Sequence, residues 1–135
     1  MTTEEVAPPA IKGLGIQQDP GYEVLCDFRN SPDASAEVTV CVSLFNYEMY
    51  IESCLDSIAA QTLDTLSLIV VDDASTDNGA DRVTKWLEAH GSRFVRACLL
   101  RHPTNLGLAA ARNTAITHSQ TEFVFILDAD RVDRS

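Results

Sequence analysis

Apolar residues between positions 38 and 127 form two kinds of pattern that alternate along the chain. Four short runs are rich in β-branched or aromatic residues, as strands buried on both faces are; they cover residues 38–45, 66–71, 94–100 and 123–127. Three stretches between these runs repeat apolar residues three and four positions apart, which indicates amphipathic helices. The helices are expected around Ile51–Ala59, Val83–His90 and Leu108–Ile116, and Gly91 is suited to end the second one.

This alternation of strands and helices predicts an α/β fold. Short helical crossovers favour a parallel sheet, here of about four strands, with helices on both faces. In such sheets, ligands bind beyond the carboxyl ends of the strands, where the strand order reverses. Residues 1–37 differ, because they hold four of the five prolines and show little periodicity. We expect a largely irregular N-terminal extension there, with one short element at Tyr22–Phe28.

Composition fits one folded domain, since the chain has 135 residues, of which 45% are hydrophobic and 22% charged. The net charge of −10 argues against a nucleic-acid partner, because nucleic-acid binding depends on clustered Lys and Arg. The four cysteines, Cys26, Cys41, Cys54 and Cys98, show no CxxC spacing, so neither a zinc site nor a disulfide scaffold is indicated. No apolar stretch is long enough to span a membrane and the acidic start is no signal peptide, so a reducing, cytoplasmic setting is expected.

Polar or turn-forming residues follow each of the four expected strands. They read SLFNYE after the first strand, DDASTDN after the second, HPTNLG after the third and DAD after the fourth. Because the carboxyl ends of parallel strands meet at one edge of the sheet, these segments are expected to form one cluster. Its candidate ligand contacts are Ser43, Phe45, Asn46, Glu48, Asp72, Asp73, Asn105 and Gly107.

The pair Asp72 and Asp73 allows two interpretations. The pair can simply start a turn, with Asp77 as the cap of the next helix. Alternatively, an aspartate fixed at a strand end accepts hydrogen bonds from a nucleotide base or a ribose.

Asp128 and Asp130 are two positions apart, so both carboxylates are expected on the same side of an extended backbone. Two such carboxylates repel each other unless a cation or a proton lies between them. Oxygen ligands of this kind suit Mg²⁺ or Mn²⁺, although a solvated turn also accounts for the pair. The scattered His90, His102 and His118 are expected to be structural or solvated.

The segment TNLGLAAARN opens the third expected helix. Gly107 permits close approach of the backbone to a ligand, and a helix amino end attracts anions. Arg112 and Asn113 interrupt an alanine-rich helix face and are expected to reach back toward the loops or the acidic edge. A purely structural ion pair is the alternative.

Four segments together resemble the nucleotide-binding half of a family 2 glycosyltransferase, whose GT-A fold is Rossmann-like. They read VTVCVSLFNYEMYIESCLDSIAAQT, LIVVDDASTDNG, NLGLAAARN and FVFILDAD, in the order of the family's motifs, and the resemblance covers about residues 38–131. It implies that residues 38–135 are the nucleotide-sugar-binding part of such a domain, truncated after the D-x-D motif.

The resemblance also implies roles for single residues. Ser43 and Phe45 stand where the family's Thr or Ser and Tyr meet the uracil ring and its ribose. Asp73 stands where an aspartate binds the base, and Arg112 and Asn113 match the family's ARN. In the D-x-D motif, Asp128 would face the ribose or sugar, and Asp130 would hold the divalent cation that bridges the diphosphate.

Some positions depart from the family's pattern. Val42 replaces a frequent Pro, Phe45 lacks the hydroxyl of the usual Tyr, and DDAS replaces the commoner DDGS. The family places its acceptor site and general base well downstream of the D-x-D motif, and this chain ends five residues after Asp130. No catalytic base is therefore expected among these residues.

The resemblance implies an enzyme that transfers a sugar from a nucleoside-diphosphate sugar, with UDP as the expected nucleotide, to an acceptor hydroxyl. The reaction would depend on Mg²⁺ or Mn²⁺ and invert the anomeric centre; the acceptor, whether saccharide, lipid or protein, is left open. This chain would hold the donor-binding half, and alone it is expected to transfer little or no sugar.

Three alternatives were weighed against the glycosyltransferase interpretation. A non-catalytic nucleotide-binding fragment would share the same motifs. A nucleotidyltransferase-like domain would need a Gly-rich amino-terminal loop with Arg and Lys, which is absent. A receiver domain would need its acidic pair after the first strand and a Lys after a later strand, yet no Lys follows Lys85.

Overall fold

The computed structural model describes residues 21–30 and 36–128. Its elements are β1 (Glu23–Arg29), β2 (Val38–Leu44), α2 (Glu48–Ala59), β3 (Leu66–Asp72), α3 (Gly79–His90), a short 3₁₀ turn η1 (Gly91–Arg93), β4 (Arg96–Arg101), α4 (Leu108–His118) and β5 (Phe123–Asp128). Within these residues, every helix is too short or too polar to cross a membrane.

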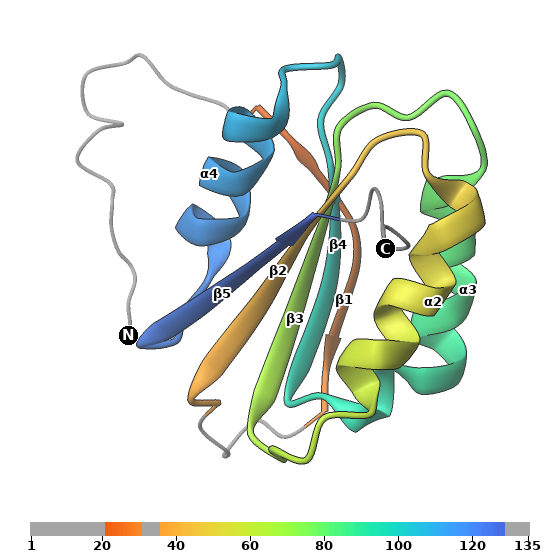
Figure 1. The fold of residues 1–135 in the computed structure, drawn as a ribbon. Coiled ribbons are helices and arrows are strands. Elements are labelled where there is room, and N and C mark those ends of the chain that lie inside the picture. The colour runs from red at the N-terminus through yellow and green to blue at the C-terminus, as the bar shows by residue number, and fades with distance from the viewer. Residues whose placement is uncertain (1–20, 31–35, 129–135) are drawn as a thin grey trace, which may run out of the picture.

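The five strands form one sheet in the order β1-β4-β3-β2-β5 (Figure 1). Strands β2 to β5 run parallel, which confirms the predicted parallel α/β sheet. The fifth strand, β1, pairs antiparallel with β4 and coincides with the one short element expected in the N-terminal extension, at Tyr22–Phe28. The β1 residues are all exposed or only half-buried, so the sequence indicated a short element there without identifying it as a strand of this sheet.

Helices cover both faces of the sheet, as predicted (Figure 1). Helices α2 and α3 pack over one face, where Val40 and Val42 of β2 join a core with Leu55 and Leu87. Helix α4 covers the opposite face, where Cys41 of β2 belongs to a second, smaller core. The β2 side chains alternate between the two cores because successive strand residues point to opposite faces.

The carboxyl ends of the parallel strands meet at one edge of the sheet. Ser43 of β2 lies beside Asp128 of β5, and Leu44 of β2 lies beside Asp72 of β3. The strand order reverses at β2, because β3 and β4 continue to one side of it and β5 lies on the other. Ligands of parallel α/β sheets bind at such a reversal.

A polar network fastens β1 to the sheet and to α4. Arg96 of β4 donates two hydrogen bonds to Asp27 of β1, at 3.0 and 3.1 Å. Its Nη2 also lies 3.2 Å from Nε2 of His118, whose Nδ1 lies 2.9 Å from the hydroxyl of Tyr22. An arginine only donates, so Nε2 accepts and the ring proton resides on Nδ1.

Acidification is expected to weaken the fold through His118. Burial, with a further contribution from the Arg96 guanidinium, lowers the pKa of His118 below its usual value of 6.5; Asp27 partly opposes this shift and Arg29 adds to it. A depressed folded pKa means that the unfolded chain binds the proton more readily. The stability from neutral His118 is therefore complete above pH 6.5 and is lost as the pH falls toward the folded pKa.

The measurement is the free energy of unfolding in urea between pH 7 and the onset of carboxylate titration. The slope that belongs to one proton is at most about 1.4 kcal/mol per pH unit, and it will be smaller for a half-buried ring. His118→Asn should lose this slope, whereas His90→Asn, at an exposed histidine, should keep it. Identical pH profiles for wild type and His118→Asn would contradict this.

Candidate functional site

A cavity of about 330 Å³ opens at the carboxyl edge of the sheet, where the strand order reverses. It is lined by Ser43, Leu44, Phe45, Tyr47, Asp73, Asn105, Gly107, Leu108, Ala111 and Asp128. Six of these ten were candidate ligand contacts in the sequence, and they come from the ends of three strands and from the start of α4. The structure therefore brings residues that are up to 85 positions apart, from Ser43 to Asp128, around one cavity.

Asp73 is held by the segment that leads into α4. Its Oδ1 accepts a hydrogen bond from the backbone N–H of Leu106 at 2.9 Å, and its Oδ2 accepts one from Gly107 N–H at 2.8 Å. The ring nitrogen Nδ1 of His102 lies 2.7 Å from the same Oδ1. Gly107 has φ of 101°, a backbone conformation that favours glycine, so this residue type permits the turn that brings its N–H to Asp73.

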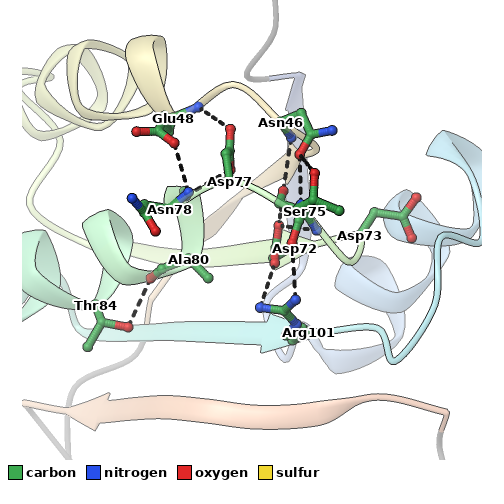
Figure 2. Close-up of polar contacts among 12 residues, drawn as sticks. Asn46, Glu48, Asp72, Asp73, Ser75, Asp77, Asn78, Ala80, Thr84 and Arg101 are labelled. Carbon is green, nitrogen blue, oxygen red and sulfur yellow. Dashed lines mark hydrogen bonds and ion pairs between the residues drawn. The ribbon is translucent and has the colours of Figure 1, made fainter.

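Asp72 points away from Asp73 and does not line the cavity (Figure 2). It is fully buried, its Oδ1 accepts hydrogen bonds from the backbone N–H and the hydroxyl of Ser75, and its Oδ2 lies 3.4 Å from Nη1 of Arg101. Burial raises the pKa of Asp72, while Ser75 and Arg101 partly oppose the shift. In this arrangement Asp72 shapes the loop after β3.

The loops after β2 and β3 are joined by Asn46. Its side-chain oxygen accepts a hydrogen bond from the backbone N–H of Thr76 at 2.8 Å, and the backbone N–H of Asn46 donates to the hydroxyl of Ser75 at 2.9 Å (Figure 2). Asn46 and Ala74 have φ of 55° and 65°, in the left-handed region. Asparagine tolerates this region, whereas an alanine there is strained by about 1 kcal/mol, so the departure from DDGS at Ala74 has a structural cost.

Glu48 and Asp77 cap each other's helices (Figure 2). The Asp77 carboxylate accepts hydrogen bonds from the backbone N–H of Glu48, which begins α2, and of Gly79, which begins α3, at 3.1 and 2.9 Å. In return, the Glu48 carboxylate accepts from Asn78 N–H at 2.8 Å and lies 3.5 Å from the Arg82 guanidinium. Glu48 was a candidate ligand contact; the structure places it at this helix junction and outside the cavity.

Removing this double cap is expected to destabilise the fold. Asp77→Ala leaves two backbone N–H groups without their acceptor, and loss of a helix cap costs about 0.5–2 kcal/mol. Asp81→Ala removes the same charge from the first turn of α3, where Asp81 makes only an exposed pair with Lys85 at 3.4 Å, so it should cost less than about 0.5 kcal/mol. Urea midpoints would show the difference, and equal midpoints for the two variants would refute the double cap.

Arg112 reaches back to the acidic edge, whereas its neighbour Asn113 is exposed and does not line the cavity. Nη2 of Arg112 donates a hydrogen bond to Oδ2 of Asp128 at 2.9 Å. The other carboxylate oxygen of Asp128, Oδ1, is buried and has no hydrogen-bond partner among the described residues. An acceptor of this kind is costly to bury alone, which favours a ligand or a cation beside it.

A divalent cation fits the chemistry of this edge. Asp128 offers an unpartnered carboxylate oxygen, and Mg²⁺ or Mn²⁺ uses one or two carboxylates together with phosphate and water oxygens. The second predicted ligand, Asp130, lies outside the described residues. The described part of the chain has no cluster of three or more His, Cys, Asp or Glu side chains that could hold a metal ion.

Phe45 and Tyr47 place two aromatic rings at the cavity. Phe45 is 40% exposed, so its ring can stack on a ligand. Tyr47, two positions further along the chain, was not a candidate in the sequence. The lining residues Leu44, Leu108 and Ala111 were also missed, as was His102 behind Asp73; the position of His102 directly after β4 was the only available signal for it.

Solved glycosyltransferase structures of the GT-A type have the same arrangement of sheet and helices. A mannosyltransferase from Pyrobaculum calidifontis, solved with GDP-Man and Mn²⁺, superposes with a TM-score of 0.65 and 38% identity over 75% of this chain and 29% of its own. S. aureus TarS residues 1–349, solved with UDP, superposes with a TM-score of 0.61 and 32% identity over 70% of this chain and 27% of its own. The chain therefore has the fold of the GT-A glycosyltransferases.

The family model for glycosyl transferase family 2 matches residues 39–134, and the chain belongs to this family. The glycosyltransferase GlyA of Streptococcus pneumoniae is 34% identical over 94 residues, which cover 70% of this chain and 13% of GlyA. The chain thus spans well under a third of each of these three relatives. The expected family and GT-A fold are confirmed, while the roles of single site residues stay predictions.

Proposed function

We propose that this chain is the donor-binding part of a metal-dependent glycosyltransferase that uses a UDP-sugar. The observation that carries the proposal is the convergence of Ser43, Phe45, Asp73 and Asp128 on one cavity at the reversal of strand order. The whole protein would transfer the sugar to an acceptor hydroxyl with inversion.

Each lining group has a task that fits its chemistry. Phe45 stacks on the base, Ser43 meets the base or ribose, and Asp73 accepts a hydrogen bond from the base. Asn105 and Gly107 form the wall beside Asp73, since the Asn105 side-chain amide lies 3.4 Å from the Asp73 carbonyl oxygen.

Arg112 holds the Asp128 carboxylate at the edge where the ribose and diphosphate would lie. Asp128 and Asp130 would hold Mg²⁺ or Mn²⁺. When bound, the cation supplies positive charge to the diphosphate, which is the leaving group of the transfer. Because the chain carries a net charge of −10, such a cation would also reduce the repulsion between the protein and a diphosphate.

A reducing, cytoplasmic setting belongs to the same proposal. All four cysteines are free. Burial raises the pKa of the Cys41 thiol to about 11 and that of Cys98 to about 12, so both thiols stay protonated and unreactive at neutral pH.

Isothermal titration of the 135-residue chain with UDP and with GDP, each in the presence of Mn²⁺, tests the proposal. We expect UDP to bind more tightly than GDP and the chain alone to release little or no UDP from UDP-sugars. Absence of nucleotide binding would overturn the proposed function, and tighter binding of GDP would change the assigned nucleobase from uracil to guanine. Robust sugar transfer by the chain alone would show that the general base and the acceptor site lie within these residues.

A further inference from the structure

His102 is a buried polar side chain beside the cavity, with a partner at each ring nitrogen. It is 1% exposed, its Nδ1 lies 2.7 Å from Oδ1 of Asp73, and its Nε2 lies 2.8 Å from the Thr114 hydroxyl of α4. Its backbone N–H also donates to the carbonyl oxygen of Asp72 at 2.9 Å. The ring therefore connects the end of β3 with the middle of α4.

The hydrogen-bond pattern defines the protonation of this ring. A carboxylate oxygen only accepts, so Nδ1 of His102 carries the proton that it shares with Asp73. In a neutral ring Nε2 then accepts, and the Thr114 hydroxyl donates to it. The Thr114 hydroxyl, which can donate or accept, is compatible with the ring form that Asp73 requires.

The same pattern shows which acceptor site of Asp73 is left for a ligand. Each carboxylate oxygen offers two lone pairs. Oδ1 uses both, for His102 and for the Leu106 N–H, whereas Oδ2 uses one, for the Gly107 N–H. The remaining site on Oδ2 belongs to a residue that lines the cavity.

We propose that His102 is a positioning residue that fixes the rotation of the Asp73 carboxylate, so that the free Oδ2 lone pair accepts the imide N3–H of a uracil ring. This inference rests on the proposed function. The two backbone donors lie just before α4, while the imidazole belongs to the residue directly after β4, so three donors hold the carboxylate. Without the ring, only the two backbone N–H groups hold the carboxylate, so its rotation about the Cβ–Cγ bond is less restricted and Oδ2 is less well oriented toward the ligand.

Two variants separate positioning from packing. His102→Leu removes both ring nitrogens, whereas His102→Asn keeps an N–H donor near the place of Nδ1 and loses the contact with Thr114. Both variants should lower the thermal midpoint, because each disturbs a fully buried site. His90→Leu, at an exposed histidine, is the control and should change neither affinity nor base preference.

The experiment compares UDP with N3-methyl-UDP, which cannot donate from N3, by isothermal titration. Wild type should bind UDP about tenfold more tightly than N3-methyl-UDP, in line with a hydrogen bond to a charged acceptor. In His102→Leu this preference should vanish through weaker UDP binding alone, and in His102→Asn it should persist. Retention of the preference by folded His102→Leu would overturn the inference and leave the proposed function standing.

The wild-type chain provides an independent test by ¹⁵N NMR of the histidine ring. The expected spectrum has the proton of His102 on Nδ1, and a proton on Nε2 alone would overturn the inference even if His102→Leu does not fold. A wild-type chain that binds no UDP at all would overturn both the inference and the proposed function.

Discussion

Asp130→Ala is expected to abolish the part of UDP affinity that depends on a divalent cation. In the wild type, Mn²⁺ should strengthen UDP binding markedly relative to EDTA, because the cation offsets the charge of the diphosphate beside an acidic edge. In Asp130→Ala, the affinities measured with Mn²⁺ and with EDTA should coincide. Isothermal titration measures both.

Two controls isolate the cation from general charge effects. Uridine carries no phosphate, so its affinity should be the same for wild type and Asp130→Ala. Glu122→Ala removes the same charge near the opposite end of β5 and should keep the full effect of Mn²⁺. Unchanged enhancement by Mn²⁺ in Asp130→Ala would remove Asp130 from its assigned role.

Asp73→Asn is expected to weaken the binding of uridine and of UDP by the same factor, about tenfold to a hundredfold. The substitution removes a charged acceptor. It also places an amide NH₂ group opposite one of the two backbone donors, either the Leu106 N–H or the Gly107 N–H. The loss should be independent of Mn²⁺, in contrast to that of Asp130→Ala. The two variants therefore separate recognition of the base from recognition of the diphosphate.

The control for Asp73→Asn is Asp81→Asn, which makes the same change of charge at an exposed position of α3. It should leave both affinities unchanged. Urea unfolding of Asp73→Asn shows the conditions under which this variant is folded. The binding titrations are carried out under those conditions. Wild-type affinity for uridine in the folded variant would mean that Asp73 does not contact the base.

Strands β2, β3 and β4 were predictable because they are largely buried on both faces, so apolar runs such as residues 66–71 stand out between helical patterns. The gathering of strand ends at one edge followed from parallel direction alone. Strand β1 could not be predicted in the same way. A short element was expected at Tyr22–Phe28, but its pairing depends on the free edge of β4, and its own side chains are too exposed to identify it as a strand of this sheet.

Neighbouring residues of one motif proved to have different surroundings. Asp72 and Asp73 were grouped as ligand contacts, yet successive residues at a strand end point to opposite sides, so only Asp73 lines the cavity. Arg112 and Asn113 are consecutive on a helix and point about 100° apart, so only Arg112 reaches Asp128. The periodicity of each element could have separated these pairs before the structure was known.

Other contacts depend on tertiary arrangement, and their partners could not be predicted from the sequence. Glu48 and Asp77 are 29 positions apart and meet only because α2 and α3 pack side by side. His102 gains its role from Asp73, which lies on the neighbouring strand end. A scattered histidine carries no such information by itself.

An NMR titration of the ¹⁵N-labelled chain with UDP and Mg²⁺ tests most directly whether the strand-end cavity binds the nucleotide. We predict the largest amide shifts at Phe45, Asp73 and Gly107, around that cavity. A second cavity of about 450 Å³ lies between α2 and β5 and is lined in part by Leu63 and Phe125. Shifts centred on Leu63 and Phe125, with Asp73 and Gly107 unmoved, would contradict the account.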